Sequence, residues 1–276
     1  MFEKAHYSPR FSASWEKTVS PGVRVLALDG GIRVNVAPAN CTCLVENADR
    51  TQLEAVLERV SGETGVSLTA VYEGNTAKIT AVGVQAHAST PDEGKNAITA
   101  TLQALCALPL AQGAAEKTVQ QLHRLFPYGD NRGKALGIAM EDAVSGCLTL
   151  TFSMVHLDST GFWGVFDSRD PLCATEENTC HVTEAKMAAF GWECKGSLGP
   201  AHAVDGESDF IKVLLNAYET YTGRKGYCEA IGGGTYVHEI PGGVAFGAGE
   251  HDFDSHLHGA NERARISLLL KTAMIY

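Results

Sequence analysis

Residues 147–168 read CLTLTFSMVHLDSTGFWGVFDS and predict a β-hairpin. Apolar and polar side chains alternate on both sides of a turn at residues 158–161, and a period of two is typical of half-buried strands. The hairpin is one part of a longer order of strand pairs and helices, which extends from it towards both ends of the chain.

Strand pairs followed by helices fill the N-terminal side of the chain. Strands are expected in four segments: 22–29, 39–46, 66–72 and 78–85. Asp49, with Gln52 three residues later, is typical of a helix start. Helices are expected in four segments: from Asp49 through Val60, 94–107, 114–126 and about 175–191. This order predicts an α+β fold in which helices cover one face of antiparallel sheets.

The C-terminal side has a different organisation. Residues 199–205 look like a linker, and a chain of 276 residues favours two domains, here 1–205 and 206–276. Two helices and two strands are expected in the second domain: 208–221, 227–230, 244–247 and 260–274. Because so small a domain is weak by itself, we expect it to expose an apolar face that a larger partner would cover.

Composition and charge exclude several functional classes. The net charge is −10 and there is no basic cluster, so nucleic acids and anionic membranes are not expected partners. No apolar run approaches the ~18 residues of a membrane span, and the N-terminus has no apolar core of a signal peptide. Without an export signal, the eight cysteines are expected to be reduced thiols of a cytoplasmic protein.

The last quarter of the chain has the residue types of a metal-dependent active site. The glycine-rich segment 232–236 is followed by residues 251–262, which contain three histidines and three carboxylates. Imidazole nitrogens and carboxylate oxygens are ligands of Zn²⁺. A self-contained zinc site that uses His251, Asp252, Asp254 and His256 is one interpretation of this loop. A solvated acidic loop is the other.

Four segments also carry a resemblance to known enzymes. They are Gly83 to Pro91 with Gly94 and Asn96, Asp167-Ser168-Arg169-Asp170-Pro171, Gly232 to Tyr236, and His258-Gly259-Ala260-Asn261-Glu262, and 33–38 is a weaker fifth match. In this order they make the chain similar to the dipeptidase branch of the zinc aminoacylase, carboxypeptidase and succinyl-diaminopimelate desuccinylase superfamily. The resemblance covers most of the chain.

The resemblance implies a fold and a reaction. Residues 1–205 would be an enlarged lid of the dimerisation type, and residues 206–276 would be the C-terminal segment of an α/β catalytic domain that holds two zinc ions. Such enzymes hydrolyse the amide bond of dipeptides or N-acyl amino acids, with water that the two zinc ions activate.

The resemblance also assigns roles to individual residues. His87 would contact the oxygen of the scissile carbonyl and stabilise its developing negative charge. Arg169 would bind the carboxylate of the substrate. A surface ion pair with Asp167 or Asp170 is the alternative for this residue. The remaining roles are one zinc ligand, His258, and a set of substrate contacts: Asn35, Gly232, Gly233, Gly234 and Thr235.

The family's other zinc ligands and its glutamate general base have no counterpart in this sequence. We therefore expect at most one partial zinc site, no activity of the chain alone, and a missing N-terminal catalytic half as its partner. The competing interpretation is a non-catalytic module that binds or dimerises through its sheet, so that the chain forms a homodimer. A basic residue that the family often places after the glycine-rich segment is replaced here by His238, which leaves the substrate preference open.

Overall fold

A computed structural model describes residues 2–16, 20–232, 234–237, 240–247, 253, 255 and 261–276. The chain divides into two compact units. The sheet unit comprises Lys4–Ala201, and the C-terminal unit comprises Met1–Glu3 together with His202–Tyr276. The first residues of the chain therefore belong with its last quarter.

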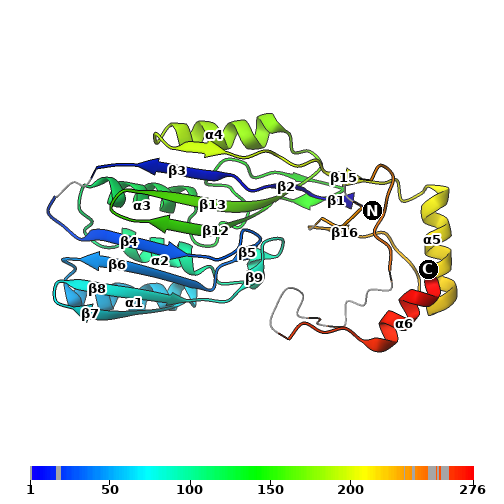
Figure 1. The fold of residues 1–276 in the computed structure, drawn as a ribbon, viewed down its shortest axis with the longest axis horizontal. Coiled ribbons are helices and arrows are strands. Elements are labelled where there is room, and N and C mark those ends of the chain that lie inside the picture. Colours follow the sequence, from blue (N-terminus) through cyan, green and yellow to red (C-terminus); the bar gives the residue numbers. More distant parts are fainter. Residues whose placement is uncertain are drawn as a thin grey trace. The chain divides into compact units, whose positions relative to one another are not determined.

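The sheet unit is built on one antiparallel sheet of nine strands. Eight strands follow the order β14-β3-β13-β12-β4-β6-β8-β7, and β2 pairs with the end of β13 (Figure 1). Their bounds are β2 Ala5–Tyr7, β3 Arg10–Ser14, β4 Arg24–Gly30, β6 Asn40–Glu46, β7 Ser67–Glu73, β8 Thr76–Val82, β12 Thr149–Leu157, β13 Gly161–Asp170 and β14 Glu193–Lys195. The predicted hairpin of residues 147–168 lies in the middle of this sheet as β12 and β13.

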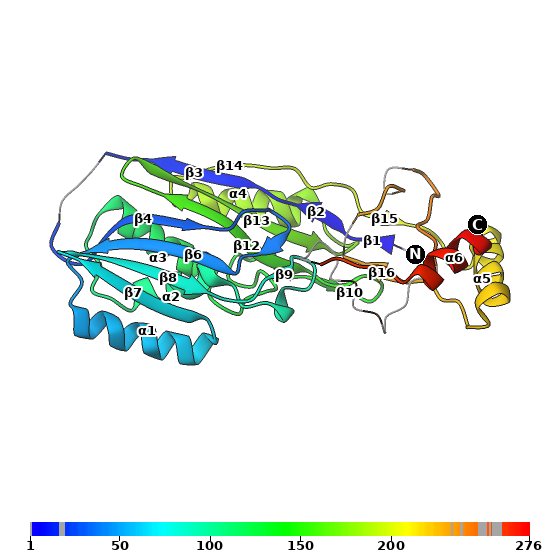
Figure 2. The same ribbon diagram turned by 60° about the horizontal axis from the view of Figure 1, so that its bottom comes forward.

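Three helices pack against the sheet, and a fourth packs against the edge strand β14 (Figure 2). Their bounds are α1 Arg50–Thr64, α2 Ala97–Cys106, α3 Ala114–Leu125 and α4 His181–Ala188. The predicted start of α1 is confirmed, because the Asp49 side chain accepts a hydrogen bond from the Gln52 amide at 2.8 Å. Helix α2 begins three residues later than predicted, because Lys95 pairs with Val84 and Asn96 is the N-cap. A separate 3-10 turn (η1, Pro91–Glu93) precedes this pairing. A π-helical turn, η2 at Glu176–Cys180, precedes α4.

The core of the sheet unit is rich in aromatic rings. Phe126, from the end of α3, stacks on Phe152 of β12 with ring centroids 4.5 Å apart. Phe11 of β3 contacts both rings and also Trp192, and its side chain is fully buried. Burial of one such side chain contributes about 1.5–3 kcal/mol, so this cluster ties strands distant in sequence to α3 and β14.

The sequence analysis did not predict β2 and β3. Residues 4–14 contain few apolar side chains and include Pro9, so their local pattern is weak. Both strands form on β13, where Tyr7 pairs with Ser168 and Phe11 pairs with Gly164. Long-range pairing therefore makes these residues strands.

The C-terminal unit holds a small three-stranded sheet. Its strands are β1 Phe2–Glu3, β15 His202–Ala203 and β16 Ala230–Ile231, and β1 lies between the other two. Strand β1 is antiparallel to β15 and parallel to β16. The unit also contains α5 Asp209–Thr222 and α6 Ile266–Ile275. The predicted strand 244–247 is wrong, and the last helix begins at residue 266 instead of residue 260.

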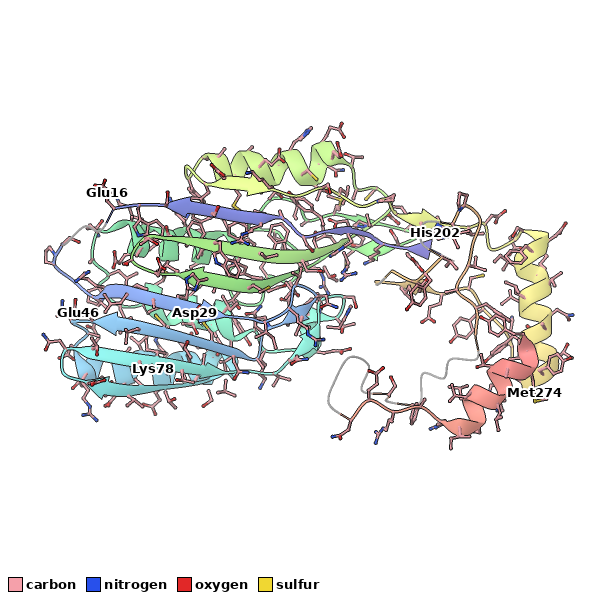
Figure 3. The ribbon with its side chains drawn as sticks, in the orientation of Figure 1. Glu16, Asp29, Glu46, Lys78, His202 and Met274 are labelled. Atoms are coloured by element: carbon pink, nitrogen blue, oxygen red, sulfur yellow. The ribbon has the colours of Figure 1, made fainter. Side chains whose placement is uncertain are left out.

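Large apolar side chains are exposed on the C-terminal unit, as predicted. Examples on α6 are Leu270 and Met274, which are 63% and 64% exposed (Met274 is labelled in Figure 3). Further exposed side chains on this unit are Phe210, Val213, Tyr221, Tyr227, Ile240, Ile266 and Leu269. None of the helices in the described part of the chain is both long enough and apolar enough to cross a bilayer.

Candidate functional site

His87 lies in a loop of the sheet unit, between Val84 and Lys95. It ends the short strand β9 (Ala86–His87), which pairs with β5 (Val36–Ala37) so that His87 is opposite Val36. The next amide, of Ala88, donates a hydrogen bond to the backbone oxygen of Asn35 at 3.0 Å. Two of the predicted site residues are therefore close together, His87 in β9 and Asn35 in the turn directly before β5.

The glycines around His87 have a structural reason. Val84 and Lys95 exchange two backbone hydrogen bonds of 3.1 and 2.8 Å, which close the loop at its base. A Cβ atom on Gly83 would lie 1.9 Å from the backbone oxygen of Lys95, and one on Gly94 would lie 2.9 Å from the Cβ of Ala86. Only glycine allows the two chain segments to approach this closely.

Asn96 fixes the end of the same loop. Its Oδ1 accepts hydrogen bonds from the amides of Ile98 and Thr99 at 3.0 and 3.2 Å, which caps α2. Its Nδ2 donates to the backbone oxygen of Phe152 at 2.9 Å, so the cap is also joined to the sheet. The motif from Gly83 to Asn96 is thus a scaffold that holds His87 in a defined place.

The hydrogen bonds of His87 define its tautomer. The Ser89 amide donates to His87 Nδ1 at 3.2 Å, and Ser89 Oγ lies 2.7 Å from the same nitrogen. A backbone N–H can only donate, so Nδ1 is the acceptor and the proton of the neutral ring is on Nε2. The ring is only partly buried.

Arg169 lies on β13 and is paired with a buried carboxylate. Its Nε and Nη2 donate to the two oxygens of Asp167 at 2.7 and 3.1 Å. The Asp167 side chain is fully buried, and the Arg169 side chain is 8% exposed. Asp167 Oδ2 also contacts His6 Nε2 at 2.7 Å, and Ser8 Oγ at 3.3 Å. The pairing of Arg169 with Asp167 was one interpretation of the sequence, but the pair is buried and does not lie on the surface. The sequence analysis missed His6 as a member of this cluster.

The His87 loop contacts β12, which pairs with the Arg169 strand β13. Thr149 of β12 is directly opposite Arg169 of β13, and residues in such a pair have Cβ atoms about 4.5–5.5 Å apart. The Thr149 hydroxyl donates to the backbone oxygen of Ala88, next to His87, at 3.4 Å. Asn35, His87 and Arg169 are therefore grouped at one end of the sheet unit.

The glycine-rich segment belongs to the C-terminal unit and is held by Glu3. The Glu3 side chain is fully buried, and its carboxylate accepts hydrogen bonds from the Thr235 amide at 3.2 Å and from the Thr235 hydroxyl at 2.5 Å. Gly232 follows β16 directly, and a Cβ atom on Gly234 would meet nothing within 4 Å. The sequence analysis missed Glu3, because its partner is 232 residues away.

Several predicted residues lie outside the described residues. They are Gly233, His238, His251, Asp252, Asp254, His256 and His258. Within the ranges that the structure describes, no three His, Cys, Asp or Glu side chains are grouped so that they could hold a metal ion. The described residues therefore supply no zinc site.

Comparisons with known proteins relate the chain to M20 peptidases. The M20 family model described as "Peptidase dimerisation domain" matches residues 71–156, from β7 to β12, and so includes His87. The Beta-Ala-Xaa dipeptidase of Lactobacillus delbrueckii subsp. lactis is 28% identical over 247 residues, which are 89% of this chain and 52% of that protein. The chain is related to the M20 dipeptidases. It spans about half the length of the curated relatives it matches.

Two solved structures align with this chain at TM-scores below 0.5. The aminoacylhistidine dipeptidase from Vibrio alginolyticus has a TM-score of 0.44 at 13% identity, over 86% of this chain and 53% of that one. The M20 family metallo-carboxypeptidase Sso-CP2 from Sulfolobus solfataricus has a TM-score of 0.42 at 10% identity, over 100% of this chain and 57% of that one. Likenesses at this level carry no argument about function.

Proposed function

We propose that this chain is the lid and the C-terminal catalytic segment of a metal-dependent M20 dipeptidase. The sheet unit would be the lid, of the dimerisation type, and the C-terminal unit would be part of a zinc-peptidase catalytic domain. The grouping of Asn35, His87 and Arg169 through Thr149 is the observation that carries the proposal. It joins a proton donor and a carboxylate receptor at one end of a rigid sheet.

In this proposal His87 acts through Nε2. Its Nδ1 accepts hydrogen bonds, so the neutral ring has a proton on Nε2 that can be donated to the oxygen of a scissile carbonyl. A donor of this kind at a developing oxyanion contributes about 2.7–4 kcal/mol to the stabilisation of a transition state. The Asn35 side chain, in the turn before β5, would add a polar contact to the bound peptide.

Arg169 would bind the terminal carboxylate of the substrate. Asp167 occupies Nε and one N–H of Nη2, and Nη1 has no hydrogen-bond partner among the described residues. The Nη1–Nη2 edge of the planar guanidinium therefore keeps donors that no described protein group uses, and we propose that a carboxylate binds this edge end-on. Dipeptides and N-acyl amino acids both carry such a carboxylate. The name of the Lactobacillus relative makes β-alanyl dipeptides the first substrates to test.

Zinc enters this proposal through the resemblance alone. His258 would be one ligand, but it lies outside the described residues, and the described residues offer no group of three ligands. When bound in a complete site, zinc would activate the attacking water. The part of the chain that the structure describes would bind and orient the substrate.

The exposed apolar side chains of the C-terminal unit support the proposal that this unit packs against another segment of the catalytic domain. Large exposed apolar side chains are typical of an interaction site, and the remaining half of the catalytic domain would cover them. The length of the relatives is consistent with such a segment. The substrate, the missing half and the complete activity are thus parts of one proposal.

The proposal is tested by complementation. The purified chain, equilibrated with zinc and dialysed, should hold less than one tightly bound ion and should not hydrolyse β-alanyl dipeptides. Addition of the preceding catalytic segment should restore turnover, and His87→Ala should then lower kcat by about a hundredfold or more. Unaided hydrolysis that survives both His87→Ala and His258→Ala would contradict the assignment.

A non-catalytic dimerisation module is the second candidate function. Strand β7 is the terminal strand of the sheet and pairs with β8 on one side, and the matched dimerisation domain begins within it. An exposed strand edge presents unpaired backbone groups that a second copy could use. Sedimentation of the metal-free chain over a range of concentrations tests this function. In an antiparallel edge strand, successive N–H groups point to opposite sides, so one of Thr69→Pro and Ala70→Pro should abolish a dimer without unfolding the sheet.

A further inference from the structure

Asp167 is shared by two side chains that come from different strands. Arg169, two residues further along β13, takes both of its oxygens, and His6 of β2 contacts Oδ2. Successive side chains of a strand alternate between faces, so Asp167 and Arg169 lie on the same face of β13. His6 is directly opposite Arg169 in the β2–β13 register, and its contact with Asp167 puts its ring on that face as well.

We propose that His6 is a positioning residue, which holds Asp167 so that the free edge of Arg169 faces a carboxylate ligand. This inference rests on the proposed function, because it assumes that Arg169 binds the substrate carboxylate. His6, on β2, belongs to none of the sequence motifs. The inference also limits the ligand to a carboxylate that approaches the guanidinium end-on.

The position of the Arg169 guanidinium depends on the Asp167 carboxylate. The guanidinium is planar, and two of its N–H groups are directed at Asp167 at 2.7 and 3.1 Å. A rotation of the carboxylate would therefore rotate the guanidinium and its Nη1–Nη2 edge with it. Geometry at a binding site must be held within about 0.5 Å, so small rotations matter.

His6 is the second strong contact of that carboxylate. Its Nε2 lies 2.7 Å from Asp167 Oδ2, whereas the Ser8 hydroxyl is 3.3 Å from the same oxygen. Ser8 Oγ instead lies 2.6 Å from His6 Nε2 and so helps to fix the ring. Without His6, one oxygen of Asp167 would keep only the longer Ser8 contact and Arg169.

His6 lies at the rim of the buried Asp167–Arg169 pair. Its side chain is 47% exposed and is no member of the hydrophobic core cluster. Its contact with Asp167 is part-buried, because the carboxylate is fully buried, so loss of His6 should lower stability as well as loosen the Asp167–Arg169 pair. A comparison of ligand binding by His6→Ala and by control variants separates the two effects.

The test uses the 276-residue chain and two probes, N-acetylglycine and N-acetylglycinamide, which lacks the carboxylate. Binding is followed by NMR through the Nε–H signal of Arg169, which Arg169→Lys identifies by its loss. The parent chain should bind N-acetylglycine and not the amide. His6→Ala should weaken N-acetylglycine binding about tenfold, which corresponds to about 1.4 kcal/mol. His6→Gln, whose amide can still donate to Asp167, should stay within about twofold of the parent.

His156→Ala is the matched control. His156 also contacts an aspartate across the same sheet, with Nδ1 2.6 Å from Asp29 Oδ1, and it pairs with Trp163, six residues before Arg169. His156→Ala should leave N-acetylglycine binding unchanged. In variants that lack the Arg169 signal, binding is followed through the backbone amide signal of Ala88. Ser8→Ala serves as a milder second variant, with weaker binding than the parent.

The outcomes separate the two claims. If His6→Ala binds N-acetylglycine as tightly as the parent while Arg169→Lys does not bind it, the role of His6 is refuted and that of Arg169 stands. If Arg169→Lys binds it normally, the carboxylate role of Arg169 fails and the inference fails with it. Equal weakening by His6→Ala and His156→Ala would indicate general loosening of the sheet, which also refutes the inference.

Discussion

Asp170 offers the sharpest test of the energetics of the sheet unit. Its side chain is fully buried, Oδ2 accepts a hydrogen bond from Ser168 at 2.8 Å, and Oδ1 has no partner among the described residues. Burial, with a smaller contribution from the neighbouring Asp167, raises the pKa of this carboxyl from 3.8 to about 7. Ionised Asp170 is therefore a destabilising group, and Asp170→Asn should stabilise the protein at pH 8.

The size and sign of the effect follow from linkage. A shift of about 3 pKa units corresponds to about 4 kcal/mol at 1.36 kcal/mol per unit, which is an upper value because the site can relax. The folded state binds the proton more tightly than the unfolded state, so the parent loses stability as the pH rises from about 4 to about 7. Asp170→Asn cannot ionise and should not show this loss, while Asn can still accept the Ser168 hydrogen bond.

The assay is urea unfolding of both proteins between about pH 5 and pH 8, followed by tryptophan fluorescence. All three tryptophans, Trp15, Trp163 and Trp192, lie in the sheet unit, so the signal reports on that unit alone. The stability advantage of Asp170→Asn should grow by about 3 kcal/mol across this range. An advantage that is the same at both ends of the range would refute the argument from burial.

Three further predictions concern other parts of the chain. The hydrogen bond to Asp29 raises the pKa of His156. The contribution of protonated His156 to stability is therefore present below about pH 6.5 and is lost as the pH rises through the folded-state pKa. His156→Gln should flatten the pH dependence of urea unfolding near neutrality, and an unchanged pH profile would contradict this prediction. Asn96→Ala removes the cap of α2 and should lower the free energy of unfolding by about 1–2 kcal/mol. Asn96→Asp keeps the cap and should have an intermediate stability. Thermal and urea unfolding curves of Asn96→Ala that match the parent would contradict this prediction. Leu269→Gln combined with Leu270→Gln should reduce binding of a hydrophobic dye to the C-terminal unit, whereas the same change at the buried Leu102 should instead unfold the sheet unit.

The parts of the fold that were predictable are those with local signals. The β12–β13 hairpin alternates in sequence, and Asp49 stands where a helix needs a cap. The cap at Asn96 and the close approach at Gly83 and Gly94 were not predicted, because they depend on the folded loop. Strands β2 and β3 have no such signal, because their partner strand is more than 140 residues away. The same limit applies to the site. His87 and Arg169 were predicted from motifs, whereas His6 and Glu3 make contacts that only the folded chain creates.

The topology explains why the two ends of the chain belong to one unit. Strand β1 is flanked by β15 and β16, and Glu3 pairs with His202 on one side and with Ile231 on the other. The chain thus leaves the C-terminal unit after Glu3 and returns to it at His202, so that Lys4–Ala201 is an insertion between two adjacent, paired strands. Strands β1 and β16 are parallel, and a parallel pair needs a crossover between them, which the inserted unit and α5 together provide. A buried carboxylate on β1 then reaches Thr235 in the glycine-rich segment that follows β16. A boundary drawn by composition at residues 205 and 206 misses this, because Phe2 and Glu3 resemble the residues that follow them and differ only in the strands with which they pair.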